Sequence, residues 1–433
     1  MQAIILAAGN CSRFWPLAQD RHKSMYEIGD GKPILAYTIA GLQKAGIDDL
    51  VVVVGEKERA IQEFFSDGKK WQVKIQYVVQ LKPLGMGEAI LRAREFLQPA
   101  RNFLVLNASQ VAAGELVNAQ RRALKLLDRQ VVLFGQKTLT PWNFGIMQID
   151  QFNVSKIVEK PENYIGDTRI LGVYALPYWF LEALEHFDQE YSFESALSSV
   201  LKKNGGVRGI ILPENISLPS LKYSWDLLAM NRWAMDRWQN RNIEMSGDVE
   251  IHPSAFIYGP VVIEKGAKIL ENAVVRGPCY IGEGSIIGTH SVVRDHCYVG
   301  RGVMVGALSE VKNSLLYDGV SLHRNFIGDS ILDRDCHIGA GTIAANKKFK
   351  RGKKEVHPHR STVRGKKIDT GLTGLGVIIG MNSEVGINVT IFPAVKIGRE
   401  AEVRPGVILP EDVPDCHISR SADINTNCER RSV

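Results

Sequence analysis

Short apolar runs alternate with amphipathic helical stretches through the first half of the chain. The predicted strands cover residues 4–9, 49–55, 74–80, 103–107 and 131–135, and predicted helices near 33–46, 57–65 and 87–97 lie between the first four. This alternation is typical of an α/β domain with a mostly parallel sheet that helices cover on both faces. We expect such a domain over residues 1–230, with the helical stretch 225–238 at its end.

A six-residue period replaces this pattern from about residue 249. Apolar residues recur without a break at Ile251, Ile257, Ile263, Ile269, Val275, Ile281, Ile287, Val293, Val299, Val305 and Val311. The phase then slips, and the period resumes at Val320, Phe326, Leu332 and Ile338, and later at Ile379, Val385, Ile391, Ile397, Val403 and Leu409. A helix cannot keep a six-residue repeat on one face, whereas a coil with three flat sides points each of these residues inward. We therefore expect a parallel β-helix over 249–415, a helical linker at 231–248 and a polar tail at 416–433.

Composition narrows the class of protein. The chain has 433 residues, of which 45% are hydrophobic and 23% charged, as in ordinary globular proteins. We see no apolar stretch of about 18 residues and no signal-peptide pattern at the N-terminus, so we expect a cytoplasmic protein without a membrane partner. The six cysteines form no CxxC pair, which disfavours zinc and redox-motif interpretations.

The positive charge is concentrated in one segment. The formal net charge is +6, and residues 347–367, KKFKRGKKEVHPHRSTVRGKK, alone carry ten Lys or Arg and one Glu. Two interpretations have about equal weight: a solvated basic loop, or a clamp for the phosphates of a cofactor or of nucleic acid. Nucleic-acid binding is the least favoured function, because Phe349 is the one aromatic residue in the segment that could stack on a base.

The segment LAAGNCSRFWPLAQDRHKSM (6–25) resembles the signature of sugar-1-phosphate nucleotidylyltransferases, roughly LAAGxGTRLxPLT followed by a lysine. A strand that runs into such a tight turn offers backbone N–H groups to a triphosphate. The resemblance implies a Rossmann-like nucleotidyltransferase domain. It also implies nucleotide binding by Leu6, Ala7, Ala8 and Gly9, and catalytic neutralisation of phosphate charge by Arg13 and Lys23.

Further segments resemble the same family in the same order. QLKPLGMGEA (80–89) resembles the base-recognition segment, which implies nucleotide binding by Gln80 and Gly85. WNFGIM (142–147) and VEKP (158–161) resemble the segments that bind the sugar phosphate, here through Gly145, Glu159 and Lys160. A plain turn at Gly145 and a surface charge at Lys160 are the competing structural explanations.

The metal site of the family is not matched. The apolar run FLVLNASQV (103–111) should end at the ligand edge of the sheet, yet it offers Asn107, Ser109 and Gln110 and no acid. Ser109 and Ser220 occupy the positions of the two family aspartates that hold Mg²⁺, an ion that prefers anionic oxygen ligands. Their loss should slow nucleotidyl transfer on the order of 10³-fold or more. Whether Glu88 or Asp226 reaches the metal position stays open.

Two smaller departures lie in the signature itself. Cys11 replaces its second glycine and would crowd the phosphates, and Ala18 replaces its last threonine.

The repeat region resembles the acetyltransferase part of bifunctional enzymes that acetylate glucosamine-1-phosphate and then uridylylate the product. SEVKNSLLYDGVSLHRNFIGDSILDRDCHIGAGTIAANKKF (309–349) carries this resemblance, and 376–398 fits the archaeal-type enzymes. It implies a left-handed β-helix that trimerises, acetyl-CoA as cofactor and His323 as general base. It also implies substrate binding by Arg294, Lys312 and Asn346. Phe326 replaces a family tyrosine, and 370–376 has no basic residue.

Two functions remain open at this point. The first is an enzyme of nucleotide-sugar biosynthesis, with acetyl transfer better preserved than nucleotidyl transfer. The second is a non-catalytic homologue that binds or senses a nucleotide or nucleotide-sugar. The expected ligands are UTP or dTTP, a nucleotide-sugar and a sugar-1-phosphate, and neither the sugar nor the base can be chosen.

Overall fold

The structure, a computed structural model, describes the chain except for residues 19, 57–58, 100, 128, 188–191, 204–205, 215, 217, 239–240, 350–356, 420–428 and 431–433. It divides into two compact units. The first comprises Met1–Asn10, Ser24–Tyr26 and Pro33–Ser220, and the second Cys11–Lys23, Glu27–Lys32 and Leu221–Val433. Most of the segment that contains the nucleotide signature therefore packs with the second unit. The expected domain boundaries at 230, 248 and 415 stay predictions.

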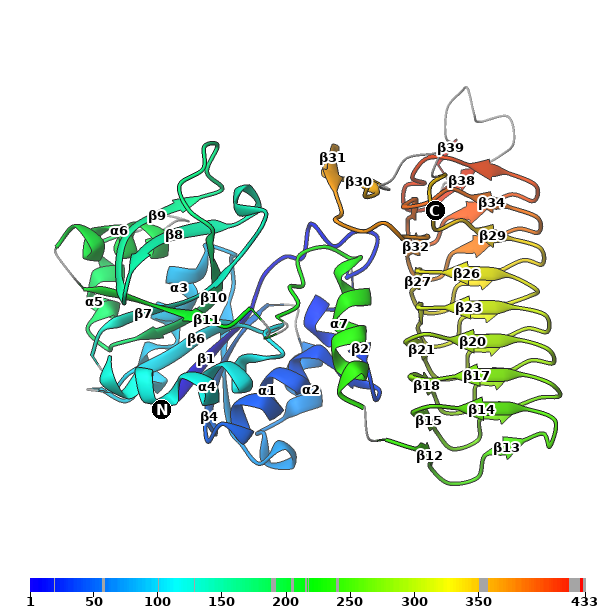
Figure 1. Ribbon diagram of the computed structural model, residues 1–433, viewed down its shortest axis with the longest axis horizontal. Helices are drawn as coiled ribbons and strands as arrows, with labels where there is room; N and C mark the ends of the chain where they lie inside the picture. Colours follow the sequence, from blue (N-terminus) through cyan, green and yellow to red (C-terminus); the bar gives the residue numbers. More distant parts are fainter. Residues whose placement is uncertain are drawn as a thin grey trace. The chain divides into compact units, whose positions relative to one another are not determined.

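The first unit is an α/β fold around one nine-stranded sheet, as predicted (Figure 1). Its strands, in spatial order, are β5 (Lys74–Gln80), β4 (Asp49–Gly55), β1 (Gln2–Ala7), β6 (Phe103–Asn107), β10 (Thr168–Leu176), β7 (Val131–Lys137), β11 (Val207–Leu212), β9 (Asn153–Glu159) and β8 (Gly145–Asp150). β5, β4, β1 and β6 are parallel, and β10 lies antiparallel between β6 and β7. The first strand begins two residues earlier than its apolar run, at Gln2.

Helices cover both faces of this sheet. Alternate strand residues enter two separate cores: Ile5 and Val52 pack in one, and Ile4 and Val51 in the other. This is why the strands read as continuous apolar runs. The first core contains residues of α1 (Ile34–Lys44), α2 (Arg59–Phe65) and α4 (Ala113–Leu126), and the second contains residues of α3 (Met86–Arg92), α5 (Phe180–Glu185) and α6 (Ser192–Lys202). The remaining elements of the first half of the chain are short: η1 (Lys23–Met25), β2 (Glu27–Ile28), β3 (Lys32–Pro33), η2 (Lys69–Trp71), η3 (Arg94–Phe96) and η4 (Pro141–Asn143). Of these, β2 packs in the second unit.

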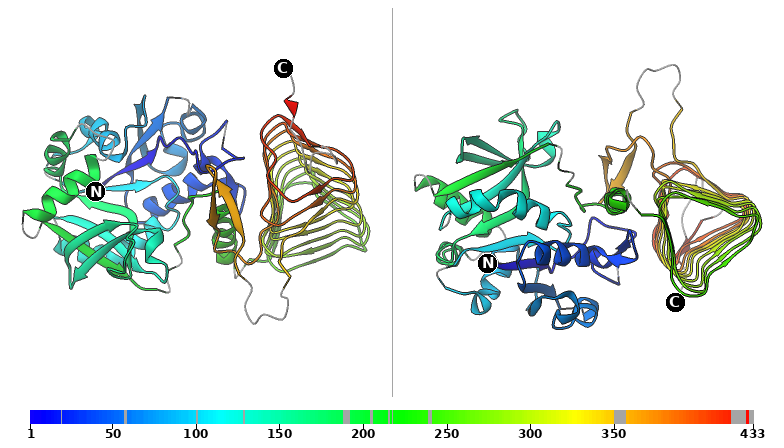
Figure 2. Two further views of the ribbon diagram at one scale, coloured as in Figure 1. Left: turned by 90° about the horizontal axis from the view of Figure 1, so that it is seen from above. Right: turned by 60° about the horizontal axis from the view of Figure 1, so that its bottom comes forward.

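The second unit is a parallel β-helix with a triangular cross-section (Figure 2). One side consists of β12 (Ile243–Met245), β15 (Val261–Ile263), β18 (Cys279–Ile281), β21 (Cys297–Val299), β24 (Leu315–Leu316), β27 (Ile331–Leu332), β32 (Ile378–Ile379) and β35 (Lys396–Ile397). The next consists of β13 (Glu250–Ile251), β16 (Lys268–Ile269), β19 (Ile286–Ile287), β22 (Met304–Val305), β25 (Ser321–Leu322), β28 (His337–Ile338), β33 (Glu384–Val385), β36 (Glu402–Val403), β38 (His417–Ser419) and β39 (Glu429–Arg430). The third consists of β14 (Phe256–Tyr258), β17 (Val274–Arg276), β20 (Val292–Arg294), β23 (Glu310–Lys312), β26 (Phe326–Gly328), β29 (Ile343–Ala344), β34 (Thr390–Ile391) and β37 (Ile408–Leu409).

The predicted inward stack is confirmed up to Val311, and these residues form one continuous core. Past the phase slip, the register pairs Val299 with Leu316, Val305 with Leu322 and Val311 with Ile327. The prediction of Phe326 as an inward residue was therefore wrong: it is half-buried and aligns with the outward-facing Glu310. The spacing of inward residues falls from six to five between Val311 and Leu316 and again between Leu322 and Ile327, and this shifts the inward position. Val320 is buried in the core, but at a corner.

The last predicted stretch, from Ile379 to Leu409, again faces the core. Between β29 and β32 the coil is interrupted by an insertion that contains most of the basic segment. Its described part includes a hairpin of β30 (Arg360–Val363) and β31 (Lys366–Asp369). Residues 350–356 of the basic segment lie outside the described residues.

α7 (Asp226–Met235) and η5 (Asp236–Trp238) precede the coil. None of the helices in the described part of the chain is both long and apolar enough to cross a membrane.

Candidate functional site

The edge of the sheet where β1 and β6 end offers no carboxylate on these two strands. Leu6 pairs with Asn107 at this edge, and Ala7 and Ala8 lead out to Gly9, where an added Cβ would meet no atom within 4 Å. Asn107 is exposed and Ser109 half-buried, directly after Ala108, whose carbonyl accepts a hydrogen bond from Thr38 Oγ1 at 3.1 Å.

The residues at the expected metal positions do not fit Mg²⁺. Ser109 and the exposed Ser220 are neutral hydroxyls, poor ligands for a hard divalent ion. Within the described parts of the chain, no group of three or more His, Cys, Asp or Glu side chains is placed to hold a metal. Glu88, one candidate replacement, accepts a hydrogen bond from Gln80 Nε2 and pairs with Arg92 on α3.

Gln80 organises the loop that precedes α3. Its side chain is 6% exposed, and its Nε2 donates to Gly85 O at 3.1 Å as well as to Glu88. Gly85 has a φ of 95°, a left-handed conformation that favours glycine. Since both contacts use Nε2, the carbonyl oxygen Oε1 is the group of Gln80 that a base N–H could approach.

The residues predicted to bind the sugar phosphate lie together on one hairpin. β8 and β9 place Gly145 directly opposite Glu159. A Cβ on residue 145 would lie 2.7 Å from Glu159 Oε2, so glycine leaves space for this carboxylate. The Lys160 ammonium lies 3.9 Å from Glu159 Oε1, and both side chains are largely exposed. The hairpin therefore presents one acid and one base to solvent beside an open glycine.

Part of the signature forms a charged cluster within the second unit. Cys11 has a φ of 49°, which explains why a glycine suits this position of the signature. Lys23 Nζ donates to Leu221 O at 2.6 Å. Burial lowers the pKa of Lys23, while the nearby charges of Cys11 and Asp226 raise it and that of Arg13 lowers it. Arg13 itself is exposed.

Asp226, the second candidate replacement ligand, has a local structural role. Its Oδ2 accepts hydrogen bonds from the backbone N–H groups of Lys222 and Tyr223, both at 2.7 Å, at the start of α7. Burial raises the pKa of Asp226 to about 6, although these two hydrogen bonds and the charge of Lys23 lower it. This carboxylate therefore stabilises the helix start and faces Lys23.

No pattern in the sequence indicates the contacts that join the signature loop, residues 11–23, to the last turns of the coil. Trp15 Nε1 donates to Asp415 Oδ1 at 2.9 Å, and the ammonium of Lys396 lies 4.9 Å from the centroid of the Trp15 ring. Arg364, on the inserted hairpin, donates to Ser12 Oγ. The partners lie hundreds of residues apart in sequence, and no local pattern signals them.

On the coil, His323 lies at the corner before β26. Its backbone N–H donates to Asn325 Oδ1 at 2.6 Å, and the buried Asn325 side chain donates in turn to Gly339 O at 2.8 Å and Thr342 O at 3.1 Å. The corner is thus tied to the next turn of the coil. The half-buried His323 ring lies beside the exposed His337, with 5.2 Å between ring centroids.

Asn346 is held at the opposite end of the same flat side. Asp329 accepts hydrogen bonds from Asn346 Nδ2 and Asn313 Nδ2, both at 2.6 Å. A Cβ on Gly328 would lie 2.8 Å from the Asn346 amide and 3.0 Å from the Phe326 ring, so both side chains pack over this glycine. His323 lies before β26 and Asn346 packs beside Gly328 at its end, so the two side chains lie at opposite ends of this strand.

Arg294 and Lys312 align on neighbouring strands, β20 and β23. The guanidinium of Arg294 donates to Glu310 Oε1 at 2.7 and 2.9 Å and contacts Asp295 at 2.5 Å. Its charge is therefore compensated by two carboxylates, and a substrate phosphate would compete with them. Lys312 aligns in turn with Gly328, beside Asn346.

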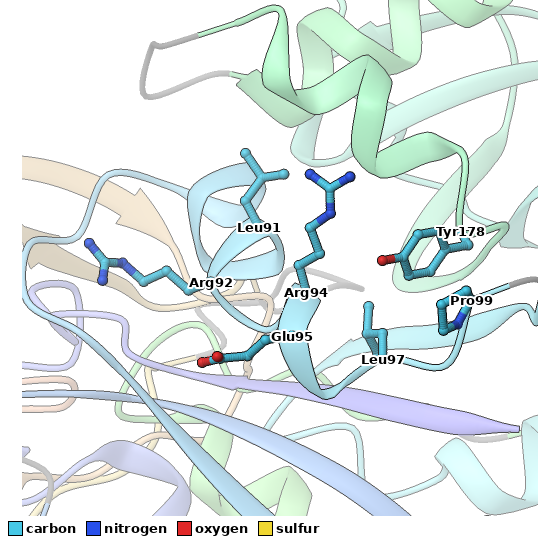
Figure 3. Close-up of a pocket in the computed structure, with 7 residues that line it drawn as sticks. All are labelled: Leu91, Arg92, Arg94, Glu95, Leu97, Pro99 and Tyr178. Atoms are coloured by element: carbon cyan, nitrogen blue, oxygen red, sulfur yellow. The ribbon is translucent and has the colours of Figure 1, made fainter.

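A pocket in the first unit is lined by residues that the sequence analysis does not single out (Figure 3). It has a volume of about 550 Å³ and is lined by Leu91, Arg92, Arg94, Glu95, Leu97, Pro99 and Tyr178. Both arginines already pair with glutamates, Arg92 with Glu88 and Arg94 with Glu185. The pocket therefore offers little uncompensated charge to a ligand.

Comparison with known proteins matches both halves. Residues 2–205 match the family model "Nucleotidyl transferase", and 278–313 match "Bacterial transferase hexapeptide (six repeats)". The chain is 37% identical to "Bifunctional protein GlmU" of Methanococcus maripaludis, over 95% of both chains. It is 32% identical to "Bifunctional sugar-1-phosphate nucleotidylyltransferase/acetyltransferase" of Sulfurisphaera tokodaii, over 95% of this chain and 98% of that one.

A shorter match, at 29% identity, is "Glucose-1-phosphate thymidylyltransferase" of Neisseria gonorrhoeae, over 40% of this chain and 60% of that one. The sequence motifs and the two-part fold agree with the two relatives that match over 95% of this chain. The chain therefore belongs to the family of archaeal bifunctional sugar-1-phosphate nucleotidylyltransferase/acetyltransferase proteins.

Proposed function

We propose that this chain acts in nucleotide-sugar biosynthesis by acetylating an amino-sugar-1-phosphate on the coil, and that its signature loop binds a nucleotide but transfers it poorly. The observation that carries the proposal is His323, held at a rigid corner of the coil by Asn325. The relative from Sulfurisphaera tokodaii is named for both activities, so the proposal distinguishes which of the two this chain retains.

His323 is the proposed general base for acetyl transfer. Acetyl-CoA, when bound, supplies the acetyl group as a thioester. The substrate amine attacks the thioester carbonyl, its proton passes to the His323 imidazole, and the thiolate of CoA leaves. Lys312 and Arg294 would hold the sugar phosphate, and the Asn346 amide, fixed by Asp329, would position the substrate or the acetyl donor. A positioned base of this kind contributes about 10²- to 10⁴-fold to rate.

The separation of His323 from Asn346 favours a site shared between copies of the chain. A homotrimer in which flat sides of neighbouring coils meet would bring residues of a second copy to His323. This assembly belongs to the proposal, and light scattering of the purified protein tests it.

The acetyl-transfer proposal is tested with a thiol-release assay on glucosamine-1-phosphate and acetyl-CoA. His323→Ala should lower kcat by about 10²-fold or more, because the amine loses its proton acceptor. His337→Ala is the matched control: it removes a neighbouring imidazole, 5.2 Å away between centroids, and should retain activity. Equal rates for wild type and His323→Ala, or a silent wild type, would contradict the assignment.

For the front site, we propose binding without a protein-held metal. Ser109 and Ser220 lack the negative charge that Mg²⁺ needs, so transfer should be slower by about 10³-fold than with two carboxylates. Calorimetric titration of UTP, dTTP and UDP-N-acetylglucosamine, in Mg²⁺ and in EDTA, should give similar affinities in both buffers. Binding that requires Mg²⁺, with turnover typical of nucleotidylyltransferases, would refute this part.

A non-catalytic homologue is the second candidate function, and the neutral side chains of Ser109 and Ser220 at the expected metal positions favour it. Nucleotide or nucleotide-sugar binding in EDTA, together with no acetyl transfer to any amino-sugar-1-phosphate, would select this regulatory or sensing role.

A further inference from the structure

The inserted hairpin brings positive charge to the signature loop. Arg364 and Gly365 form its two-residue turn, with φ values of 48° and 75°, between the paired Val363 and Lys366. Arginine in a left-handed conformation is unfavourable, and glycine or asparagine is the usual choice at this position. The guanidinium of Arg364 donates to Ser12 Oγ, next to Arg13.

The hairpin and the signature loop both contact Lys396 of the coil. Lys396, at the start of β35, is 2% exposed; its Nζ donates to Thr362 O on the hairpin and lies over the Trp15 ring of the loop. Ser361 Oγ of the hairpin also donates to Ala394 O at 3.4 Å. Trp15 is fixed by Asp415. The coil therefore sets the position of Arg364 relative to the residues that precede and follow Ser12.

The position of Arg364 next to Ser12 matters because the negative charge of a nucleotide triphosphate needs a cation beside it. A triphosphate normally approaches a protein with a divalent cation that neutralises part of its charge, and Ser109 and Ser220 do not fit that ion. A guanidinium offers several N–H donors in a planar fork that matches phosphate oxygens. The side chain of Arg364 is long and exposed, so it can exchange the Ser12 hydroxyl for a phosphate.

We propose that Arg364 binds a nucleotide phosphate together with Ser12 and Arg13, signature residues that pack in the same unit as the hairpin, and supplies part of the positive charge that a metal ion would otherwise bring. This inference rests on the proposed nucleotide binding by the signature loop. It also gives a role to the inserted basic segment, whose hairpin turn carries Arg364.

The test is titration of UTP and dTTP in EDTA against the full-length wild type and three variants. Arg364→Gln should weaken binding of the better nucleotide about tenfold or more, because a charged hydrogen bond to phosphate is lost. Arg364→Lys should recover most of the affinity. Arg360→Gln is the matched control on the same hairpin, since Arg360 donates to Lys367 O at its other end, and it should bind like the wild type.

Salt separates a charge effect from a structural one. The difference between wild type and Arg364→Gln should shrink as KCl rises from about 0.05 to 0.5 M, because salt screens an exposed ion pair. Wild-type affinity in Arg364→Gln, or a loss that is independent of salt, would overturn the role of Arg364 alone. If the wild type binds neither nucleotide in EDTA, the proposed nucleotide binding fails, and the role of Arg364 falls with it.

Discussion

Lys396 allows a quantitative test of how the coil holds the signature loop. Its side chain is fully enclosed, with the ammonium over the Trp15 ring and a hydrogen bond to the carbonyl of Thr362. Burial lowers the pKa of Lys396 from 10.5 to about 8; the charge of Asp412 opposes this change and that of Lys367 adds to it. The folded protein therefore holds this proton less tightly than the unfolded chain does.

The sign of the pH effect follows from proton binding. Between about pH 8 and 10.5 the unfolded state binds more protons at this residue, so raising the pH stabilises the folded state. The full difference between the two pKa values corresponds to roughly 3 kcal/mol, at about 1.4 kcal/mol for each pH unit. From about pH 7 to 9.5 the expected gain is roughly 2 kcal/mol, because part of the range lies outside this interval.

The assay is urea unfolding followed by circular dichroism, for wild type and Lys396→Met at both pH values. Methionine keeps a long side chain over Trp15 but cannot be protonated. The difference in stability between the two proteins therefore isolates Lys396, because every other titrating group contributes equally to both. The wild type should gain roughly 2 kcal/mol relative to Lys396→Met as the pH rises from about 7 to 9.5. An unchanged difference between the two proteins would show that the buried ammonium carries no such penalty, and would refute this reasoning.

Two further substitutions test local packing. Asn325→Ala removes three hydrogen bonds around the buried corner of His323, so it should lower the free energy of unfolding by about 3 kcal/mol and speed hydrogen exchange of the His323 amide; unchanged exchange would contradict the geometry. Gly114→Ala should destabilise the first unit by about 2 kcal/mol, because its Cβ would lie 1.9 Å from Gly41 O where α4 meets α1; an unchanged melting temperature would disprove that contact.

The fold was predictable wherever a local period controls it. Each inward residue of the coil repeats at a fixed spacing, so Ile263 or Val299 could be assigned without knowledge of its neighbours. The assignment failed at Phe326, where a shortened turn moves the inward position by one residue and Ile327 takes it. Both residues are apolar, so composition could not distinguish them.

The candidate site was predictable only in part, for a similar reason. Gly145, Glu159 and Lys160 meet because two adjacent strands of one hairpin carry them, which is a short-range relation. Trp15 and Asp415 are 400 residues apart in sequence, and no period or motif links them. The role of Asn325 at the His323 corner could not be predicted either, because its three hydrogen-bond partners are backbone groups, which any residue type carries.

Lys23 and Trp15 of the signature have structural roles, so their match to the family is weaker evidence for catalysis. Lys23 holds the carbonyl of Leu221 beside Asp226, and Trp15 is fixed by Asp415, so these residues support the fold of the second unit whether or not nucleotide is transferred. A chain that lost nucleotidyl transfer would still need them, because their removal would take a hydrogen bond from Leu221 O and another from Asp415 Oδ1. Resemblance at Lys23 therefore supports common ancestry more strongly than activity. Ser109 carries a neutral hydroxyl where the resemblance implies a metal-binding aspartate, so it bears more directly than Lys23 on the proposed loss of transfer.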